Sequence, residues 1–380
     1  ARLRRCMPSR PVPESSATLP LEFEYNFDSE FARDLRQAVH ATIGHVENEA
    51  ATPALLFRMA MYVILWVWTL SQWIAHPSLW SGLLLGMAMA MIGLNVQHDA
   101  NHGALWTYPF LQSMLGFALD IIGGSKYLWI QQHWSHHAHT NSAQDCDAFS
   151  TLPFLMLQPP HGDGGTSPKL FHAWQHWFAL PLFTFYYLST QLSPMWITGV
   201  HENAAWNVHA GKYFTAESHK WTTRVLKILH LASVPFPPVW HYGFGLHAAM
   251  CISVCVVSAS IIFTCLFILS HNFEGSDRDP RRNHHFGKRR KVCWARMQVE
   301  TSASYGGKWT GWITGGNNFQ IEHHLFPRIC SAWYPYIQPV VREICKKHGV
   351  RYTYFPTMAQ NAASTLAYLA NVANPKTHRQ

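Results

Sequence analysis

Long apolar segments with few charged residues alternate with polar segments along the sequence. Four of them approach the ~20 residues that a helix needs to cross a bilayer. They cover residues 55–74, 79–96, 225–244 and 248–269. Only Ala75 to Ser78 separates the first two, which leaves room for a turn alone. The pattern predicts an all-α integral membrane protein with four transmembrane helices, the third of them interrupted by prolines.

A fifth apolar segment, residues 171–197, is rich in aromatic residues and is broken by Pro181 and Pro194. If the histidine clusters described below share one side of the membrane, an even number of crossings must separate residues 140 and 320. Counting this segment as a span would make that number odd. We therefore expect an interfacial or re-entrant element here, four crossings in total, and both termini in the cytosol.

The two ends of the chain are expected to lie outside the membrane. The first 20 residues are rich in proline and serine, and residues 22–50 can form a helix with Phe31, Leu35 and Val39 on one face. The sequence begins at Ala1, which leaves room for residues upstream. The expected organisation is a cytosolic lead with an amphipathic helix, a membrane domain and a C-terminal tail, at residues 1–50, 51–360 and 361–380.

Composition adds a metal site to this picture. Charged residues make up 13% of the chain, roughly half the ~25% of an average soluble protein. The 25 histidines outnumber the 21 aspartates and glutamates. The eight cysteines form no Cys-x-x-Cys pair, which favours a reducing compartment. The low charge excludes an ordinary soluble domain and a disordered chain, and the excess of imidazole indicates nitrogen ligands for a metal.

The net charge of +8 comes largely from two basic runs, residues 1–5 and 278–291. Such runs can bind nucleic acid. These two flank hydrophobic segments, and nothing else in the sequence resembles a nucleic-acid-binding fold. We therefore interpret them as cytosolic, juxtamembrane charge and expect no nucleic-acid partner.

Histidines gather in three short clusters beside the ends of the apolar segments. Within each cluster the later side chains follow the first by three or four residues, which places them on one face of a helix. The clusters are His98 with His102; His133 with His136 and His137; and Gln320 with His323 and His324. One histidine pair alone is weak evidence in a chain so rich in histidine, but the repeated spacing predicts a metal site. His271, two residues after the fourth span, is a further candidate ligand.

The number of ligands bears on the metal. Eight imidazoles exceed the four ligands of a structural zinc site and suit two metal ions. Imidazole binds iron, copper, zinc and nickel well, and pairs of iron ions occur in helical bundles. Nearby carboxylates could fix the imidazole tautomers from a second shell, or could be surface or capping residues. These carboxylates are Asp99, Asp145, Asp147 and Glu322.

At the three clusters the sequence resembles the membrane fatty acid desaturases, most closely their front-end subfamily. The matching segments are residues 31–36, 98–104, 133–141, 294–302 and 320–327, and the likeness extends over roughly residues 30–360. Gln320 stands where other desaturases have a histidine, as is typical of enzymes that desaturate between an existing double bond and the carboxyl end. The subfamily's amino-terminal cytochrome b5 domain, with its His-Pro-Gly-Gly motif, is absent from these residues, so that domain lies upstream or the donor is a separate protein.

The resemblance implies the ligands and the reaction. The family's metal-binding histidines correspond to His98, His102, His133, His136, His137, His323 and His324, with His271 as an additional ligand and Gln320 left open. It implies two iron ions, dioxygen as co-substrate, and electrons from cytochrome b5 and its NADH-dependent reductase. The acyl chain would arrive as an acyl-CoA or bound to a phospholipid, in the endoplasmic reticulum or a plastid membrane. A sphingolipid long-chain-base desaturase and a lipid hydroxylase of the same fold are the alternatives within this resemblance.

A methylene group offers no polar handle, so an apolar tunnel must hold the acyl chain in register. The candidates for its lining are Trp106, Trp129, Trp134, Trp312 and Phe319, each of which could equally be an ordinary packing residue. A histidine-rich metal transporter and a haem protein are the competing hypotheses from other classes. A transporter would place ionisable groups in the middle of its spans. The clusters lie at span ends instead, which favours the enzyme.

Overall fold

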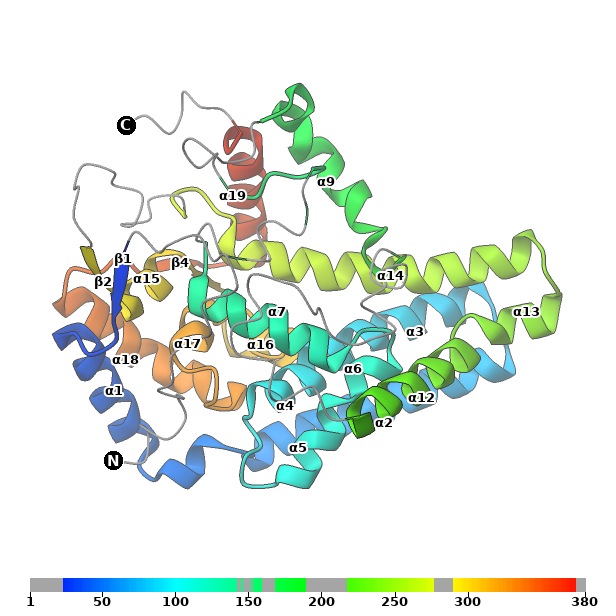
Figure 1. Cartoon of the computed structure of the whole chain (residues 1–380), viewed down its shortest axis with the longest axis horizontal. Coiled ribbons are helices and arrows are strands. Elements are labelled where there is room, and N and C mark those ends of the chain that lie inside the picture. Colours follow the sequence, from blue (N-terminus) through cyan, green and yellow to red (C-terminus); the bar gives the residue numbers. More distant parts are fainter. Residues whose placement is uncertain are drawn as a thin grey trace.

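The computed structural model describes residues 23–141, 145, 151, 153–158, 168–188, 217–276 and 290–373. These residues form a mainly helical molecule, with long helices at one end and shorter helices packed together at the other (Figure 1). The expectation of an all-α architecture is met, apart from two small pairs of parallel strands.

The amino-terminal segment forms strand β1 (Phe23–Asn26), helix α1 (Glu30–Ile43) and the short helix η2 (Val46–Glu49). Ser29 caps α1, because its Oγ accepts a hydrogen bond from the backbone N–H of Ala32. The face of α1 that contains Leu35 and Val39 is buried, and it packs on helix α18 (Tyr334–Lys347). The amphipathic helix expected here is present, and it lies on the body of the protein.

Among the described residues, three helical segments are long and apolar enough to cross a membrane: Val46–Ala75, Leu79–His102 and Leu246–His271. They contain helices α2 (Pro53–Ala75), α3 (Leu79–Ile92) and α14 (Leu246–His271). α2 and α3 form the expected hairpin, and α14 packs along α3 (Figure 1). Three of the four expected spans thus have matching helices, and the protein associates with a membrane.

The second span does not continue as a regular α-helix to its end. After Ile92 the backbone widens into a π-helical turn, Gly93–Gln97, and then resumes as α4 (His98–His102). The turn is braced by Asn95, whose amide donates to the carbonyl of Ile313 at 3.0 Å. Wide turns of this kind are frequent at functional sites, because they change the direction of the side chains that follow.

The third expected span, residues 225–244, is interrupted as its prolines predicted, but its bounds differ. α12 (Glu217–Ser233) begins earlier than expected, and α13 (Phe236–Tyr242) follows a turn at Val234 and Pro235. The proline-rich sequence breaks the helix because proline lacks a backbone N–H. The break leaves the carbonyl of Val234 free to accept a hydrogen bond from the indole N–H of Trp73, at 3.0 Å. This bond attaches the turn to α2.

The fifth apolar segment forms η5 (Leu170–Trp174) and α9 (Gln175–Phe183). Its residues 189–197 lie outside the described part of the chain. α9 rises obliquely from α14 toward α19 (Met358–Asn371), away from the axis of the long helices (Figure 1). Trp174 and Trp177 on this segment are exposed.

The remaining elements build a cap at the end of the long helices. Its helices are α5 (Pro109–Gly116), α6 (Ala118–Ile121), α7 (Lys126–His139), α15 (Trp294–Glu300), α16 (Lys308–Thr314), α17 (Gln320–Leu325), η7 (Ser331–Trp333) and α18. Strand β1 pairs with β2 (Arg290–Cys293), and β3 (Ala303–Tyr305) pairs with β4 (Thr353–Phe355). α19 occupies the first part of the segment expected as a tail, and it packs against α9 and α14.

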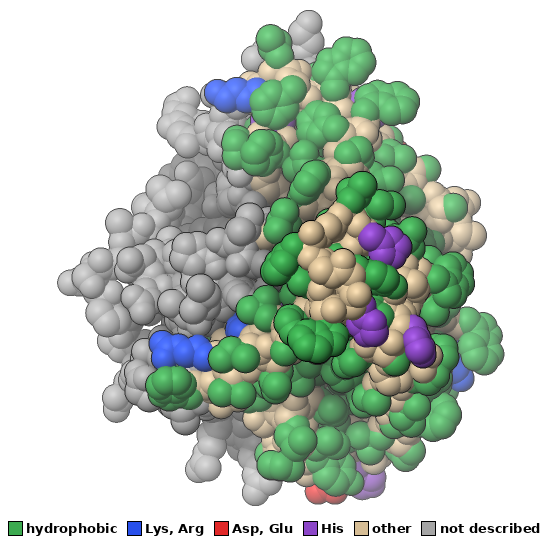
Figure 2. Space-filling model, turned by 90° about the vertical axis from the view of Figure 1, so that its right-hand side faces the viewer, with side chains coloured by type: hydrophobic (Ala, Val, Ile, Leu, Met, Phe, Trp, Pro, Cys, Tyr) green, Lys and Arg blue, Asp and Glu red, His purple; other side chains and the backbone are tan. Residues whose placement is uncertain are grey.

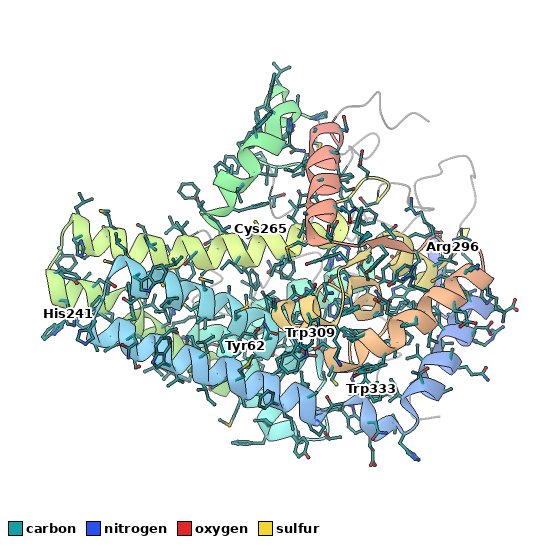
Figure 3. All side chains as sticks on the ribbon, turned by 180° about the vertical axis from the view of Figure 1, so that it is seen from behind. Tyr62, His241, Cys265, Arg296, Trp309 and Trp333 are labelled. Atoms are coloured by element: carbon teal, nitrogen blue, oxygen red, sulfur yellow. The ribbon has the colours of Figure 1, made fainter. Side chains whose placement is uncertain are left out.

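The described residues form three apolar clusters, of which the smallest joins α9 to α19 through Ala179 and Leu369. The two larger ones stabilise the long helices and the cap. One lies among the long helices and includes Leu85, Met89 and Cys255; the other lies within the cap and includes Leu35 and Ile337. Figure 3 shows the two parts at opposite ends, with His241 at one end and Trp333 and Arg296 at the other. The α13 end of the long helices, which lies farthest from the cap, exposes mostly hydrophobic side chains (Figure 2).

Close packing of α3 against α14 gives a first prediction. A Cβ atom on Gly86 would lie only 2.1 Å from the carbonyl oxygen of Cys255. We expect Gly86→Ala to destabilise the protein by about 1–3 kcal/mol, because the helix backbones would have to separate. Thermal unfolding in detergent measures the change. Gly307→Ala is the control, because its Cβ would meet nothing within 4 Å; equal stability of the two variants would contradict the prediction.

Candidate metal centre

The eight histidines proposed from the sequence lie in one buried cluster at the junction of the long helices and the cap. They come from four helices, and each is at most 7% exposed. α4 carries His98 and His102; α7 carries His133, His136 and His137; α14 ends at His271; α17 carries His323 and His324. The spacing placed each pair on one helix face, and the tertiary structure directs those faces toward a common centre.

Within the cluster the ring nitrogens form three overlapping groups. In each group, one nitrogen from every histidine lies within 4.8 Å of the others. The groups are His98, His102, His133 and His323; His136, His271 and His324; and His137, His323 and His324. The first two groups share no member, and the third joins them. This arrangement suits two neighbouring metal ions.

On several histidines the Nδ1 atom is engaged outside the cluster. His136 Nδ1 lies 2.9 Å from a carboxylate oxygen of Asp145. His271 Nδ1 lies 3.1 Å from the carbonyl oxygen of Thr301. An Nδ1–H that donates to such an acceptor leaves the Nε2 lone pair available to a metal, as is typical of metal-bound histidines.

Gln298 organises two further histidines from the cap. Its Oε1 atom lies 2.8 Å from His324 Nδ1 and also accepts a hydrogen bond from Thr140 Oγ1 at 3.1 Å. Its amide nitrogen donates to the carbonyl oxygen of His137 at 2.7 Å. One buried glutamine therefore orients α7 and α17 relative to each other.

Four Nε2 atoms at the centre have no hydrogen-bond partner within the described residues; they belong to His98, His102, His323 and His324. Burying a polar atom without a partner is costly. Burial also lowers the pKa of His323 and His324 well below the ordinary value, so both are neutral. Neutral imidazoles with buried, converging lone pairs are the donors that a transition metal needs, and the residues therefore fit the metal that the sequence predicts.

Gln320 also faces the cluster. Its Nε2 atom lies 3.0 Å from His271 Nε2, and its Oε1 atom is buried without a hydrogen-bond partner in the described residues. A half-turn of the amide would exchange the two atoms. The side chain therefore stands beside the group of His136, His271 and His324 and can offer an oxygen to it.

The carboxylates proposed for a second shell have different environments. Asp145 contacts His136, and although burial opposes ionisation, the neighbouring imidazole and hydrogen bonds hold the pKa of Asp145 below its ordinary value. Asp147 lies outside the described residues. Asp99, by contrast, is bonded to Arg58 at 3.1 Å and to the backbone N–H of Ser331 at 2.9 Å. It connects α2, α4 and η7 and does not act through a described imidazole hydrogen bond.

Glu322 also differs from the expectation. It accepts hydrogen bonds from Tyr352 Oη at 2.7 Å and from Ser304 Oγ at 3.1 Å, away from the histidine side chains. Burial raises the pKa of Glu322 to about 7. Its contacts attach α17 to β3 and to the segment before β4.

Of the five aromatic residues proposed for a tunnel, Trp129 lies against the histidines. Its ring stacks on His133 with centroids 4.3 Å apart and meets His102 edge to face at 5.3 Å. Trp106 and Trp312 are partly buried, Trp134 is 42% exposed and Phe319 is packed in the cap core. The Trp129 ring therefore forms part of the surface that surrounds the candidate metal ligands.

Sequence reasoning did not identify Gln298, Thr301 or Tyr334 as supporting residues. Tyr334 Oη lies 3.3 Å from His323 Nδ1. No spacing rule points to these residues, because they are distant in sequence from the histidines they contact. The one signal was the family-like segment 294–302, which contains Gln298 and Thr301.

Comparison with known proteins identifies related sequences. Residues 71–356 match the family model described as fatty acid desaturase. An acyl-lipid (7-3)-desaturase of Diacronema lutheri is 35% identical over 293 residues, covering 76% of this chain and 62% of that protein. An sn-1 linoleoyl-lipid 6-desaturase of Arthrospira platensis is 27% identical over 370 residues, covering 91% of this chain and 94% of that protein.

A chloroplastic acyl-lipid (7-3)-desaturase of Chlamydomonas reinhardtii is 32% identical over 332 residues. The match covers 85% of this chain and 60% of that protein. The chain thus spans about three-fifths of the length of the (7-3)-desaturases that it matches.

The contact between His136 and Asp145 yields the second prediction. Asp145→Asn keeps the size of the side chain but removes the charge that holds the imidazole tautomer. We expect the affinity for a divalent transition metal to fall roughly 10–100-fold. Competition between the purified protein and a chelator for Co²⁺ measures this affinity.

Asp34→Asn is the matched control, because Asp34 pairs with Lys347 and His348 on the surface of the cap. It should leave the affinity unchanged. Equal affinities of the Asp145 and Asp34 variants would show that the carboxylate does not support a metal ligand.

Proposed function

Because this chain belongs to the fatty acid desaturase family, we propose that it is the catalytic unit of an O2-dependent front-end desaturase. It introduces a cis double bond into a long unsaturated acyl chain, between an existing double bond and the carboxyl end. The observation that carries the proposal is the buried cluster of eight histidines, with Gln320 at its edge. The names of the relatives, acyl-lipid (7-3)- and linoleoyl-lipid 6-desaturase, support a lipid-bound acyl substrate.

Two iron ions bound in the cluster would activate dioxygen to remove two hydrogens from adjacent methylenes. The groups around His98 and around His136 would each hold one ion, with His137 between them. Asp145 and Gln298 keep the Nε2 atoms of His136 and His324 directed inward. The chain's own contribution is thus a buried set of nitrogen donors held in fixed orientations.

The acyl chain must be held by an apolar surface, so that one particular pair of methylenes lies beside the metal centre. Trp129 supplies an apolar surface within van der Waals reach of His133 and His102. We assign to it the role of holding the reacting methylenes beside the metal centre. Trp106, Trp134, Trp312 and Phe319 stay candidates for more distant parts of the tunnel.

Helix α12 supports a fourth crossing, because its exposure pattern is the reverse of that in a soluble protein. Its buried side chains are polar: Thr223, Lys227 and His230 are each at most 4% exposed. Its exposed side chains are apolar and include Trp221, Val225, Ile228, Leu229 and Leu231. Such a helix is stable where lipid replaces water on its outer face. With α13, it completes a bundle of four crossings whose histidine end and termini face the cytosol.

The buried lysine of α12 has a partner in the cap-side helices. Lys227 Nζ lies 3.5 Å from Asp120, which also accepts a hydrogen bond from the backbone N–H of Lys126 at 2.9 Å. His230 Nδ1 lies 2.9 Å from the carbonyl of Ile121. These contacts hold α12 against α6 at the start of the helix that carries His133.

The remaining elements of the proposal rest on the resemblance to the family. The electrons come from cytochrome b5 and its NADH-dependent reductase, and the substrate is an acyl-CoA or a phospholipid-bound acyl chain. The membrane is that of the endoplasmic reticulum, or a plastid membrane, for which the chloroplastic relative is a precedent. The exposed tryptophans of α9 suit a position at the membrane interface.

The deciding experiment is expression in a host that lacks polyunsaturated fatty acids and is fed candidate acids. We expect a new double bond on the carboxyl side of an existing one, located by mass spectrometry. His323→Ala should abolish the product, because it removes a donor shared by two of the nitrogen groups.

Purified protein from the same host should contain about two irons per chain and show no haem Soret band. A Soret band, zinc in place of iron, or product from His323→Ala at the level of the unaltered protein would contradict the proposal. Thermal unfolding of the variant checks that the bundle remains folded.

Gln320 provides a further prediction. Gln320→His should retain more activity than Gln320→Ala, because an imidazole can again offer a donor toward His271. Turnover of a fed substrate, normalised to the amount of protein, measures both. Equal loss in the two variants would place Gln320 outside the metal site. Gln37→Ala, at an exposed position of α1, is the control.

A further inference from the structure

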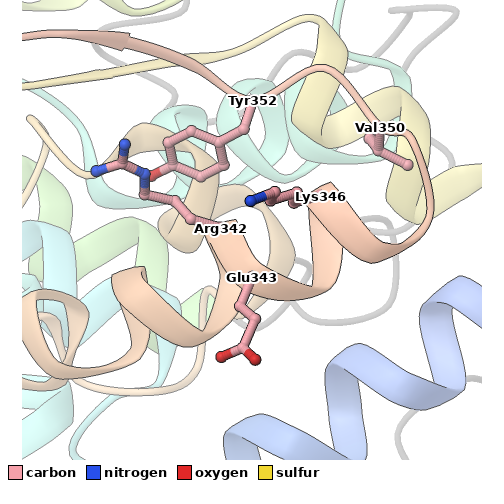
Figure 4. Close-up of a pocket in the computed structure, with 5 residues that line it drawn as sticks. All are labelled: Arg342, Glu343, Lys346, Val350 and Tyr352. Atoms are coloured by element: carbon pink, nitrogen blue, oxygen red, sulfur yellow. The ribbon is translucent and has the colours of Figure 1, made fainter.

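A surface groove lies on the cap between α18 and the segment that leads into β4. It is lined by Arg342, Glu343, Lys346, Val350 and Tyr352 (Figure 4). The proposed reaction does not use it. It lies at the opposite end of the molecule from the α13 end of the long helices, and therefore on the aqueous side of the proposed topology (Figure 1).

The groove has a positive rim. Arg342 and Lys346 lie one helical turn apart on α18, both are exposed, and neither forms an ion pair with any other residue that the structure describes. The Arg342 guanidinium is held 5.7 Å from the ring centre of Tyr352 and 5.0 Å from that of Tyr354. Glu343 points away from Lys346 (Figure 4). The Arg342 guanidinium is thus held beside two tyrosine rings, and both cations are exposed to an acidic partner.

Tyr352, which lines the groove, connects it to the helix that carries two of the candidate metal ligands. Tyr352 Oη donates a hydrogen bond to Glu322 Oε1 at 2.7 Å. Glu322 immediately precedes His323 on α17, and both are buried. One hydrogen bond therefore separates the groove from the helix that carries two candidate ligands, and electron transfer falls steeply with distance.

We propose that this groove is the docking surface for the protein that supplies electrons, a small one-electron carrier with an acidic surface around its redox group. The inference rests on the proposed function. Each desaturation reduces O2 to two waters, with two hydrogens from the acyl chain, two protons, and two electrons. The donor therefore binds twice per turnover and is oxidised by one electron each time. Weak, salt-sensitive contacts between opposite charges suit such repeated short encounters.

The test uses the full chain in detergent or nanodiscs, with the reduced soluble haem domain of a cytochrome b5 as donor. Arg342→Glu combined with Lys346→Glu should raise the KM for the donor roughly tenfold at low salt and weaken its dependence on ionic strength. The rate with a small chemical reductant should not change. Arg33→Glu combined with Lys308→Glu is the control, because it alters the net charge equally at exposed sites outside the groove.

An unchanged KM for the groove variant, or an equal rise in the control, would overturn the docking site while leaving the desaturase intact. Loss of binding to anionic phospholipid vesicles with no change in the donor KM would also overturn it, and would identify a lipid headgroup as the occupant. Absence of desaturation by the unaltered protein with the chemical reductant would instead refute the proposed function.

Discussion

The structure depends on bringing eight imidazoles into one buried space. Each ring has two nitrogens, and a buried polar atom without a partner is costly. The outer nitrogens of His136 and His324 are therefore matched to Asp145 and Gln298, while the inner nitrogens converge. This constraint requires four helices to direct their histidines into one common region. They are α4, α7, α14 and α17. Before α4, the π-helical turn Gly93–Gln97 sets the direction in which His98 leaves the helix.

Buried ion pairs connect the long helices to neighbouring elements. Arg58 of α2 reaches Asp99 beside the first histidine and lies 2.5 Å from Ser331. Lys227 of α12 pairs with Asp120. In an apolar setting a broken pair of this kind leaves an uncompensated charge, so each pair fixes the relative position of the two elements that it joins. Asp99 directly follows His98 on α4, so its pair with Arg58 also fixes the position of that histidine.

The two sides of the cluster differ in chemistry. Toward the long helices, Trp129 presents an apolar ring to the imidazoles. Toward the cap surface, Glu322 and Tyr352 form a polar connection to a positively charged groove. In the function that we propose, the acyl chain would approach on the apolar side and the electron donor on the polar side, so the two would not compete for one path.

The sequence alone determined the helical class, the apolar segments and the eight histidines, because helix periodicity and span length are local properties that one segment expresses by itself. The prolines predicted an interruption in residues 225–244, but the sequence could not determine that Trp73 holds the turn at Val234. The tertiary structure also decided which carboxylate serves a histidine: Asp145 does, whereas Asp99 serves Arg58. Asp99 and Asp145 look alike in sequence, and only the packing of distant segments selects the partner of each.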